Sequence, residues 1–303
     1  MSEARPFASQ TGKSPSEKKR VTLRDVAEEA GVSLKTASNV INHTGRMTDA
    51  TREKVQKVVD RLGYRVNVSA RNLNRGRTGF ITLAVPCLTA PYLAELANRV
   101  IDAARIYGYS VYVTTYAEGT SHGVTSLLRN FNSTISDGMI LSLSEMEDLT
   151  PEDLSVDYPL VCVGARFTHY KADHVTPDDV QSARLATEYL LDRGVSRPAV
   201  VGSRTDFAQL STLRDVTEGN AQLRMRGVFE ACCDRNIALA TELMPNVGQD
   251  WSIGSGARNM QRIIDSGVPF DGVIALNDQL AMGALSTLAA NGIYVPDQVQ
   301  VIG

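Results

Sequence analysis

Short β-branched runs alternate with amphipathic stretches from Gly79 to the last residue, and this alternation constrains the fold more than any other feature. Such runs are typical of strands buried in a parallel sheet. They predict strands at residues 80–86, 110–116, 137–143, 159–164, 198–202, 271–277 and 299–303. The stretches between them predict helices at residues 92–107, 121–132, 180–193, 220–236, 252–266 and 278–291. The pattern indicates a doubly wound α/β fold, in which ligands bind at the carboxyl ends of the strands.

The N-terminal part of the chain has a different pattern. Residues 1–20 are rich in Ser, Lys and Pro and lack periodicity, so we expect a disordered basic tail. Three short amphipathic stretches follow within residues 21–65, and a tight connection joins the first two. This spacing predicts a compact bundle with a helix-turn-helix. Residues 66–78 combine four apolar side chains with several arginines and predict a linker with marginal helical character.

Polar residues mark the ends of these three helices. Thr22, Ser33 and Thr48 each precede an apolar stripe and are expected to be N-caps. Gly31 and Gly63 stand where C-terminal caps occur. The stripes that are expected to face inward are Leu23, Val26, Ala27 and Ala30, then Leu34, Ala37, Val40 and Ile41, then Val55, Val58, Val59 and Leu62.

The second helix has an outward face of short hydrogen-bonding side chains. Lys35, Ser38, Asn39 and Asn42 lie on it, with Thr36 near its start, and it carries no carboxylate. Asparagine can pair with adenine, lysine can reach guanine, and serine or threonine can bond to any base. DNA phosphates repel carboxylates, so a helix face that binds DNA is expected to lack them. The alternative is an ordinary solvated helix face, which usually mixes Glu with Lys.

The distribution of charge supports a nucleic-acid-binding segment fused to a different body. The net charge is −3, but residues 1–76 carry 15 Lys and Arg against 8 Asp and Glu, whereas the rest carries 16 against 26. A basic segment on an acidic body is typical of such fusions, although a basic solvated tail gives the same count. The four cysteines form no CxxC pair and predict reduced, mostly buried thiols in a cytoplasmic protein.

Several classes of protein lack support in the sequence. There is no GxGxxG after a strand, no P-loop and no GxSxG motif, and His169 and His174 have the wrong spacing for one helix face. We therefore expect no enzyme activity, no cofactor and no metal. No apolar run reaches the ~20 residues that span a bilayer, and the N-terminus has no signal-peptide core. A free periplasmic sugar-binding protein would need a signal peptide and no helix-turn-helix, so this class is not expected.

The stretch VTLRDVAEEAGVSLKTASNVIN resembles the helix-turn-helix signature of the LacI/GalR family of transcriptional regulators. The resemblance continues through TREKVQKVVDRLGYRVNVSARNL and RTGFITLAVP, and recurs at DDVQSARLATEYLLDRGV, RMRGVFEAC, LNDQLAMGAL and PDQVQVIG. It therefore covers the chain from Val21 to Gly303. It implies a helix-turn-helix domain, a hinge helix at residues 66–78, and a two-lobed sensor resembling type I periplasmic binding proteins, with lobes at residues 79–176 and 177–303.

The resemblance also implies how the chain contacts DNA. The helix that begins at Ser33 would lie in the major groove, with Leu34, Lys35 and Asn39 facing the bases. Ser33, Thr36, Ser38 and Asn42 would mainly anchor to phosphates. The hinge VSARNL would fold on DNA, and Leu73 matches the family's leucine wedge in the minor groove, the alternative being a simple linker contact. The remaining expected DNA contacts are Thr22, Tyr64, Asn67, Ala70 and Arg71. The partners implied are a pseudo-palindromic double-stranded operator and a second copy of the chain, in the cytoplasm at the nucleoid.

A small polar effector, such as a sugar or related metabolite, is the other implied partner. Arg224 matches the family's ligand-clamping arginine, with a surface salt bridge as the alternative. Trp251 matches an aromatic residue that stacks on a sugar in some members, with a core position as the alternative. Asn277, which follows a strand, and the pair Pro91 and Tyr92 would line the cleft. Asp278 could cap the next helix instead.

Some positions depart from the family pattern or leave it open. Asn39 stands where an arginine is usual. Asp178 and Asp179 occupy the place of the family's Asp-Asn pair near the crossover. The chain stops at VIG, where family members continue with segments that return to the first lobe, so a fragment or a truncated product is expected. Repression is the commoner mode in the family. Activation, dual regulation, or DNA binding without a ligand response stay open.

Overall fold

The computed structural model describes residues 21–65, 77–117, 123–143, 149–204, 212–248 and 250–303. The chain divides into two compact units, one ending at Thr78 and the other running from Gly79 to Gly303. The expected basic tail and most of the expected hinge helix, including Asn67, Ala70, Arg71 and Leu73, lie outside the described residues. No helix in the described part has the combination of length and apolarity that crossing a membrane requires.

The N-terminal unit contains three helices, α1 (Leu23–Glu29), α2 (Leu34–Ile41) and α3 (Asp49–Leu62). The expected caps are confirmed, because Thr22, Ser33 and Thr48 each accept a hydrogen bond from a backbone N–H in the first turn. Gly31 follows α1 with φ of 61°, a left-handed conformation that glycine adopts without strain. The next amide, of Val32, bonds to Ala27 O and closes the end of α1.

A small apolar core holds this unit together. Val26, Ala30, Val40, Val55 and Val58 are buried in one cluster. The inward placement of Leu34 is wrong, because its side chain is 48% exposed. Leu34 is the first residue of α2, and the bundle does not extend far enough to cover it.

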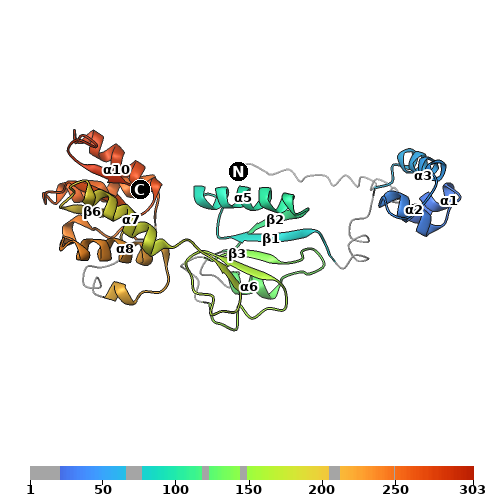
Figure 1. Ribbon diagram of the computed structural model, residues 1–303, viewed down its shortest axis with the longest axis horizontal. Helices are drawn as coiled ribbons and strands as arrows, with labels where there is room; N and C mark the ends of the chain where they lie inside the picture. Colours follow the sequence, from blue (N-terminus) through green and yellow to red (C-terminus); the bar gives the residue numbers. More distant parts are fainter. Residues whose placement is uncertain (1–20, 66–76, 118–122, 144–148, 205–211, 249) are drawn as a thin grey trace, which may run out of the picture. The chain divides into compact units, whose positions relative to one another are not determined.

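The second unit begins with a five-stranded parallel sheet in the order β2-β1-β3-β4-β5 (Figure 1). Its strands are β1 (Phe80–Val85), β2 (Ser110–Thr115), β3 (Met139–Ser142), β4 (Leu160–Val163) and β5 (Asp173–Val175). Helices α5 (Pro91–Ile106) and α6 (Val124–Arg129) cover it. Leu83 and Val85 of β1 pack in the cluster of α5, whereas Ala84 packs in that of α6. Successive strand residues therefore point to opposite, covered faces, as in a doubly wound sheet.

A three-stranded parallel sheet, in the order β6-β7-β8, forms the second lobe of this unit. Its strands are β6 (Pro198–Val201), β7 (Gly272–Ala275) and β8 (Gln300–Ile302), with the short 3₁₀ helix η2 (Thr241–Leu243) beside β6. The helices of this lobe are α7 (Asp179–Asp192), α8 (Asn220–Asp234), α9 (Ile253–Asp265) and α10 (Asp278–Ala290). Every residue of β6 and β7 is buried, and most of them belong to the largest apolar cluster among the described residues.

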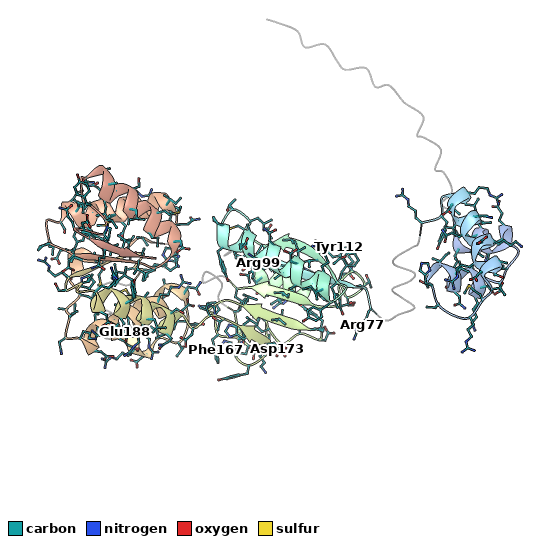
Figure 2. All side chains as sticks on the ribbon, turned by 45° about the horizontal axis from the view of Figure 1, so that its top comes forward. Arg77, Arg99, Tyr112, Phe167, Asp173 and Glu188 are labelled. Atoms are coloured by element: carbon teal, nitrogen blue, oxygen red, sulfur yellow. The ribbon has the colours of Figure 1, made fainter. Side chains whose placement is uncertain are left out.

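The α/β fold class and all seven expected strands are confirmed. The expected helices form within two or three residues of their expected ends, and the first residues of the 121–132 prediction lie outside the described residues. The sequence-based predictions do not include strand β5. Its first residue, Asp173, is labelled in Figure 2. The four cysteines, all within the described residues, form no disulfide, and burial raises the pKa values of Cys162 and Cys232 to about 12, which keeps both thiols protonated.

Candidate DNA-binding surface and effector site

Helix α2 has two solvent-exposed side chains in its first turn. Leu34 and Lys35 are exposed, and Lys35 has no ion-pair or hydrogen-bond partner within the described residues. The helix has no acidic residue in its first turn, so its positive N-terminal end is not neutralised locally. Arg46, in the turn between α2 and α3, is a further exposed cation that the sequence reasoning missed. Helix α2 itself carries no carboxylate, so Lys35 adds its charge to the positive end of this helix without local compensation.

The other polar residues of α2 bond to one another in pairs. The hydroxyl oxygens of Ser33 and Thr36 are 2.8 Å apart, and Ser33 Oγ also accepts from the Thr36 amide. Asn42 Nδ2 donates to the carbonyl and the hydroxyl of Ser38. These bonds fix the rotamers of the side chains and leave further donor and acceptor capacity on the hydroxyls for phosphate oxygens.

Asn39 occupies a half-buried position on the same helix. A Cβ added at Gly45 would lie 2.8 Å from Asn39 Nδ2, so the amide packs against this glycine of the following turn. Gly45 has φ of 78°, and the Thr44 amide donates to Asn39 O. Asn39 therefore braces the turn that carries Arg46, in addition to any contact that it makes with a base.

Thr22 immediately precedes the first helix of the bundle, and Tyr64 follows the last one. The Thr22 hydroxyl and amide bond to the Asp25 carboxylate in a capping box. Tyr64 is partly buried against the core of the bundle. Both residues have a structural role in this unit, and their expected contacts with DNA stay predictions.

Three of the five expected effector residues meet in the second lobe. The guanidinium carbon of Arg224 lies 5.6 Å from the centroid of the Trp251 ring, and Arg224 Nη1 donates to Leu276 O at 2.6 Å. Asn277 Nδ2 donates to Trp251 O at 3.3 Å. Because β7 ends just before Leu276, the cluster lies at the carboxyl end of a parallel strand, where ligands of such sheets bind.

The end of β6 supports the same cluster. Trp251 Nε1 donates to Gly202 O at 3.1 Å. Gly202 has φ of 112°, and a Cβ there would lie 2.6 Å from Leu280 Cδ1, so this turn requires glycine. The guanidinium of Arg204 also lies over Trp251, 4.8 Å from its centroid. Arg204 is absent from the sequence-based site because its place beside Trp251 depends on the fold.

The cap of α10 is Asn277 itself, so of the two neighbouring residues it is not Asp278, the alternative, that caps this helix. Asn277 Oδ1 accepts from the Leu280 amide at 2.8 Å. Together with its bond to Trp251 O, this contact uses both ends of the side-chain amide. Asn277 therefore connects the start of α10 to the segment that carries Trp251.

Asp179 is the partner of Arg224 that sequence reasoning left out of the site. Its Oδ1 accepts from Arg224 Nε at 2.7 Å, and its side chain is 2% exposed. Asp179 begins α7 and Arg224 lies on α8, and these helices approach closely at Gly227. A Cβ at Gly227 would lie 2.2 Å from Val180 O. Arg224 is thus ion-paired, but with a buried carboxylate and not in the surface salt bridge that was the alternative, and its contact with an effector stays a prediction.

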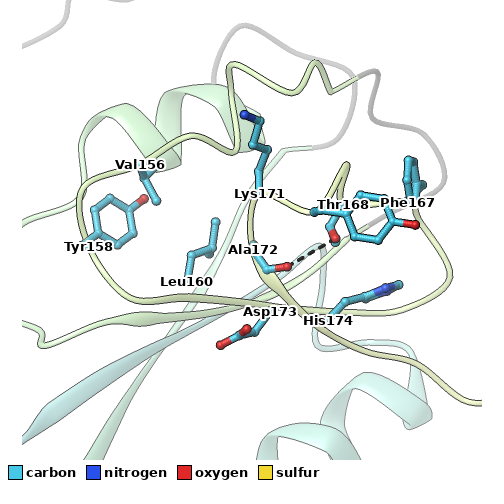
Figure 3. A pocket seen from close by; sticks show the side chains of 10 residues that line it. Val156, Tyr158, Leu160, Phe167, Thr168, Lys171, Ala172, Asp173 and His174 are labelled. Atoms are coloured by element: carbon cyan, nitrogen blue, oxygen red, sulfur yellow. Dashed lines mark hydrogen bonds between the residues drawn. The ribbon is translucent and has the colours of Figure 1, made fainter.

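Pro91 and Tyr92 begin α5 in the first lobe. Tyr92 is 62% exposed. The first lobe also has a cavity of about 530 Å³ beside β4 and β5 (Figure 3). Its lining includes Tyr158, Phe167 and His174, and none of the expected effector residues. The cluster in the second lobe, and not this cavity, carries the chemistry that the sequence predicts.

Comparison with known proteins identifies both parts of the chain. The family model for bacterial regulatory proteins of the lacI family matches residues 22–67, and that for the periplasmic binding protein-like domain matches residues 187–303. The HTH-type transcriptional repressor PurR of Vibrio parahaemolyticus serotype O3:K6 (strain RIMD 2210633) is 31% identical over 296 residues, covering 93% of this chain and 81% of that protein.

Two solved structures extend the comparison. A putative transcriptional regulator of the LacI family from Sanguibacter keddieii DSM 10542 is 34% identical, with a TM-score of 0.63 over 75% of this chain and 77% of its own. A complex of the transcriptional regulator CelR with cellobiose is 26% identical, with a TM-score of 0.60 over 94% of this chain and 82% of its own. The chain, with its helix-turn-helix unit and its periplasmic-binding-protein-like sensor, belongs to the LacI family of transcriptional regulators.

Proposed function

We propose that this regulator is a repressor that binds a pseudo-palindromic operator as a dimer and responds to a small polar effector. The observation that carries the proposal is the exposed, carboxylate-free face of α2, with Leu34 and Lys35 free at its first turn. A helix with this surface fits the major groove, where amide, hydroxyl and ammonium groups reach base edges. Such a repressor acts in the cytoplasm, on nucleoid DNA.

An exposed apolar surface on the first lobe supports the dimer. Ile106 and Tyr107 at the end of α5 are 82% and 79% exposed, and Tyr112 on the edge strand β2 is 45% exposed. Figure 2 labels Tyr112 and, on α5, Arg99. Exposed apolar side chains on two adjoining elements favour an interaction surface there. A two-fold dimer would place two copies of α2 on two half-sites of an operator.

The cluster of Arg224, Trp251 and Asp179 supports an effector that carries hydroxyl groups. An aromatic face, a guanidinium and a carboxylate at the end of parallel strands are the polar and stacking groups that a sugar needs. The structure of the relative CelR contains cellobiose. We assign the same class of ligand, sugars and related polyols, to this chain.

Salt should weaken operator binding steeply. If each half-site engages roughly three to five phosphates, the affinity should fall by about a thousandfold to a hundred-thousandfold between about 50 mM and about 200 mM salt, because each neutralised phosphate releases counterions. Titration of a fluorescent operator at four salt concentrations measures the slope. Lys35→Ala should either lower the slope by about one for each half-site, if Lys35 contacts phosphate, or relax the preference for one base. A flat salt dependence would contradict the proposal.

Replacing Asn39 should change the sequence that the protein prefers. Asparagine offers a bidentate pair to adenine, whereas Asn39→Arg offers one to guanine, a change worth about 1–3 kcal/mol of discrimination at one position of each half-site. Selection from randomised DNA by the two proteins measures this shift. An unchanged preference would mean that Asn39 only braces the turn at Gly45, with Leu34 and Lys35 as the residues that read the bases.

A thermal-shift screen of the full chain against sugars, polyols and nucleosides tests the effector. A ligand at about 100 times its Kd should stabilise the protein by about 2.7 kcal/mol, seen as a rise in Tm. Any compound that raises the Tm should also change the operator affinity. Compounds that raise the Tm while leaving operator binding unchanged would argue against an effector role.

A further inference from the structure

Asp179 is buried beside the expected effector site with half of its carboxylate unsatisfied. Its Oδ1 bonds to Arg224 Nε, whereas its Oδ2 is buried and has no hydrogen-bond partner within the described residues. A carboxylate oxygen left in this state costs free energy, and a donor from a ligand would remove that cost. A buried carboxylate accepts hydrogen bonds and donates none.

Arg224 is already committed to protein groups on two of its nitrogens. Nε donates to Asp179 and Nη1 donates to Leu276 O. Its positive charge is compensated by a carboxylate at 2.7 Å, so an anion brought to Arg224 would also meet the negative charge of Asp179. What Arg224 and Asp179 jointly offer is therefore a donor beside an acceptor, the complement of a hydroxyl group.

We propose that Asp179 is the residue that sets the charge class of the effector: it selects a neutral ligand with a hydroxyl donor and excludes carboxylates and phosphates from Arg224. The hydroxyl donates to Asp179 Oδ2 and accepts from the remaining guanidinium N–H groups, next to the ring of Trp251. This inference rests on the proposed effector site, and it deepens that proposal by naming the ligand chemistry and the residue that enforces it.

Inorganic phosphate is the probe that isolates the charge effect. We expect no saturable binding of phosphate by the unmodified full chain. Asp179→Asn keeps the size and shape of the side chain and removes the negative charge, so the variant should bind phosphate at least roughly tenfold more tightly. Isothermal calorimetry measures this gain, and quenching of Trp251, the single tryptophan, reports it independently. The added substitution Arg224→Ala should abolish it.

Asp178→Asn is the matched control, because it makes the same chemical change one residue earlier. Asp178 is the N-cap of α7, a role that asparagine also fills, and its Oδ1 bonds to the Gln181 amide. This variant should bind phosphate no better than the unmodified protein. If Asp179→Asn does not fold, judged by circular dichroism, Asp179→Ser removes the same charge and takes its place.

The binding of uncharged ligands provides a second test of Asp179. Any sugar or polyol that binds the unmodified chain should lose at least roughly tenfold in affinity in Asp179→Asn, because a charge-assisted hydrogen bond is lost. Phosphate binding by the unmodified chain equal to that of Asp179→Asn, or no gain in that variant, overturns the inference. Asp179→Asn could gain phosphate binding while no sugar alters the operator affinity. That result would support the role of Asp179 in ligand selection and would contradict the proposal that the ligand is an effector.

Discussion

Gly227→Ala should destabilise the second lobe by about 3 kcal/mol or more, because the added Cβ would lie 2.2 Å from Val180 O and 2.8 Å from the Arg184 amide. Both neighbours are backbone atoms at the crossing of α7 and α8, so a side-chain rotation cannot relieve the overlap. The helices must separate, and the separation moves Arg224 away from Asp179. We therefore expect the variant to lose effector binding as well as stability.

Urea unfolding followed by the fluorescence of Trp251 measures this effect, since the only tryptophan lies in the same lobe. Gly254→Ala is the control in α9. Its Cβ would come no closer than 3.4 Å to other atoms, and the nearest is the end of the Arg258 side chain. There the loss of backbone freedom in the unfolded chain dominates, and the control should be neutral or more stable by up to about 1 kcal/mol. Equal stability of the two variants would contradict the close approach of α7 and α8.

Arg224→Ala should destabilise the protein by roughly 2–4 kcal/mol, because it leaves the Asp179 carboxylate buried without its counter-charge. The double variant Arg224→Ala with Asp179→Asn should recover most of this loss, since a neutral amide costs less to bury than a charge. A thermodynamic cycle over the four proteins gives the coupling between the two residues.

Arg235→Ala supplies the comparison for an exposed pair. Arg235 pairs with Asp192 at 2.6 Å, but both side chains are about half exposed. Its removal should change the free energy of unfolding little, as is usual for surface ion pairs. If Arg224→Ala is no more costly than Arg235→Ala, and the double variant recovers nothing, the Asp179–Arg224 pair is not the buried interaction described above.

The strands of the sensor could be predicted because their sequences repeat one local signal. Buried runs such as Pro198–Val201 and Gly272–Ala275 are apolar throughout, and their burial is complete. Strand β5 has no such signal, since all three of its residues are exposed and two are polar. It exists because its backbone pairs with β4, a contact that no local pattern encodes.

The two errors in the helix-turn-helix unit and at α10 have a common origin at helix starts. Leu34 fits the apolar period of α2, yet it stands in the first turn, beyond the reach of the small core. Asn277 and Asp278 are both good caps by residue type, and in the structure Asn277 takes the cap position. Periodicity and propensity predict the end of an element to within two or three residues, and tertiary packing fixes it.

The effector site could be predicted only in part for a related reason. Arg224 and Trp251 are expected from the family resemblance, and the structure brings them together. The pairing of Arg224 with Asp179 spans 45 residues and depends on the glycine contact between α7 and α8. No local motif reveals such a contact.

Selection of binding sites from randomised double-stranded DNA by the full chain tests the central claim most directly. A dimer that reads the major groove with α2 should enrich a pseudo-palindrome, with half-sites about one helical turn apart, at roughly 200 mM salt or below. The Lys35→Ala variant should enrich a motif with weaker preference at one position of each half-site or bind all sites more weakly. Recovery of sequences without a common motif, with the protein folded and in excess, would contradict the claim that this chain is a sequence-specific operator-binding protein.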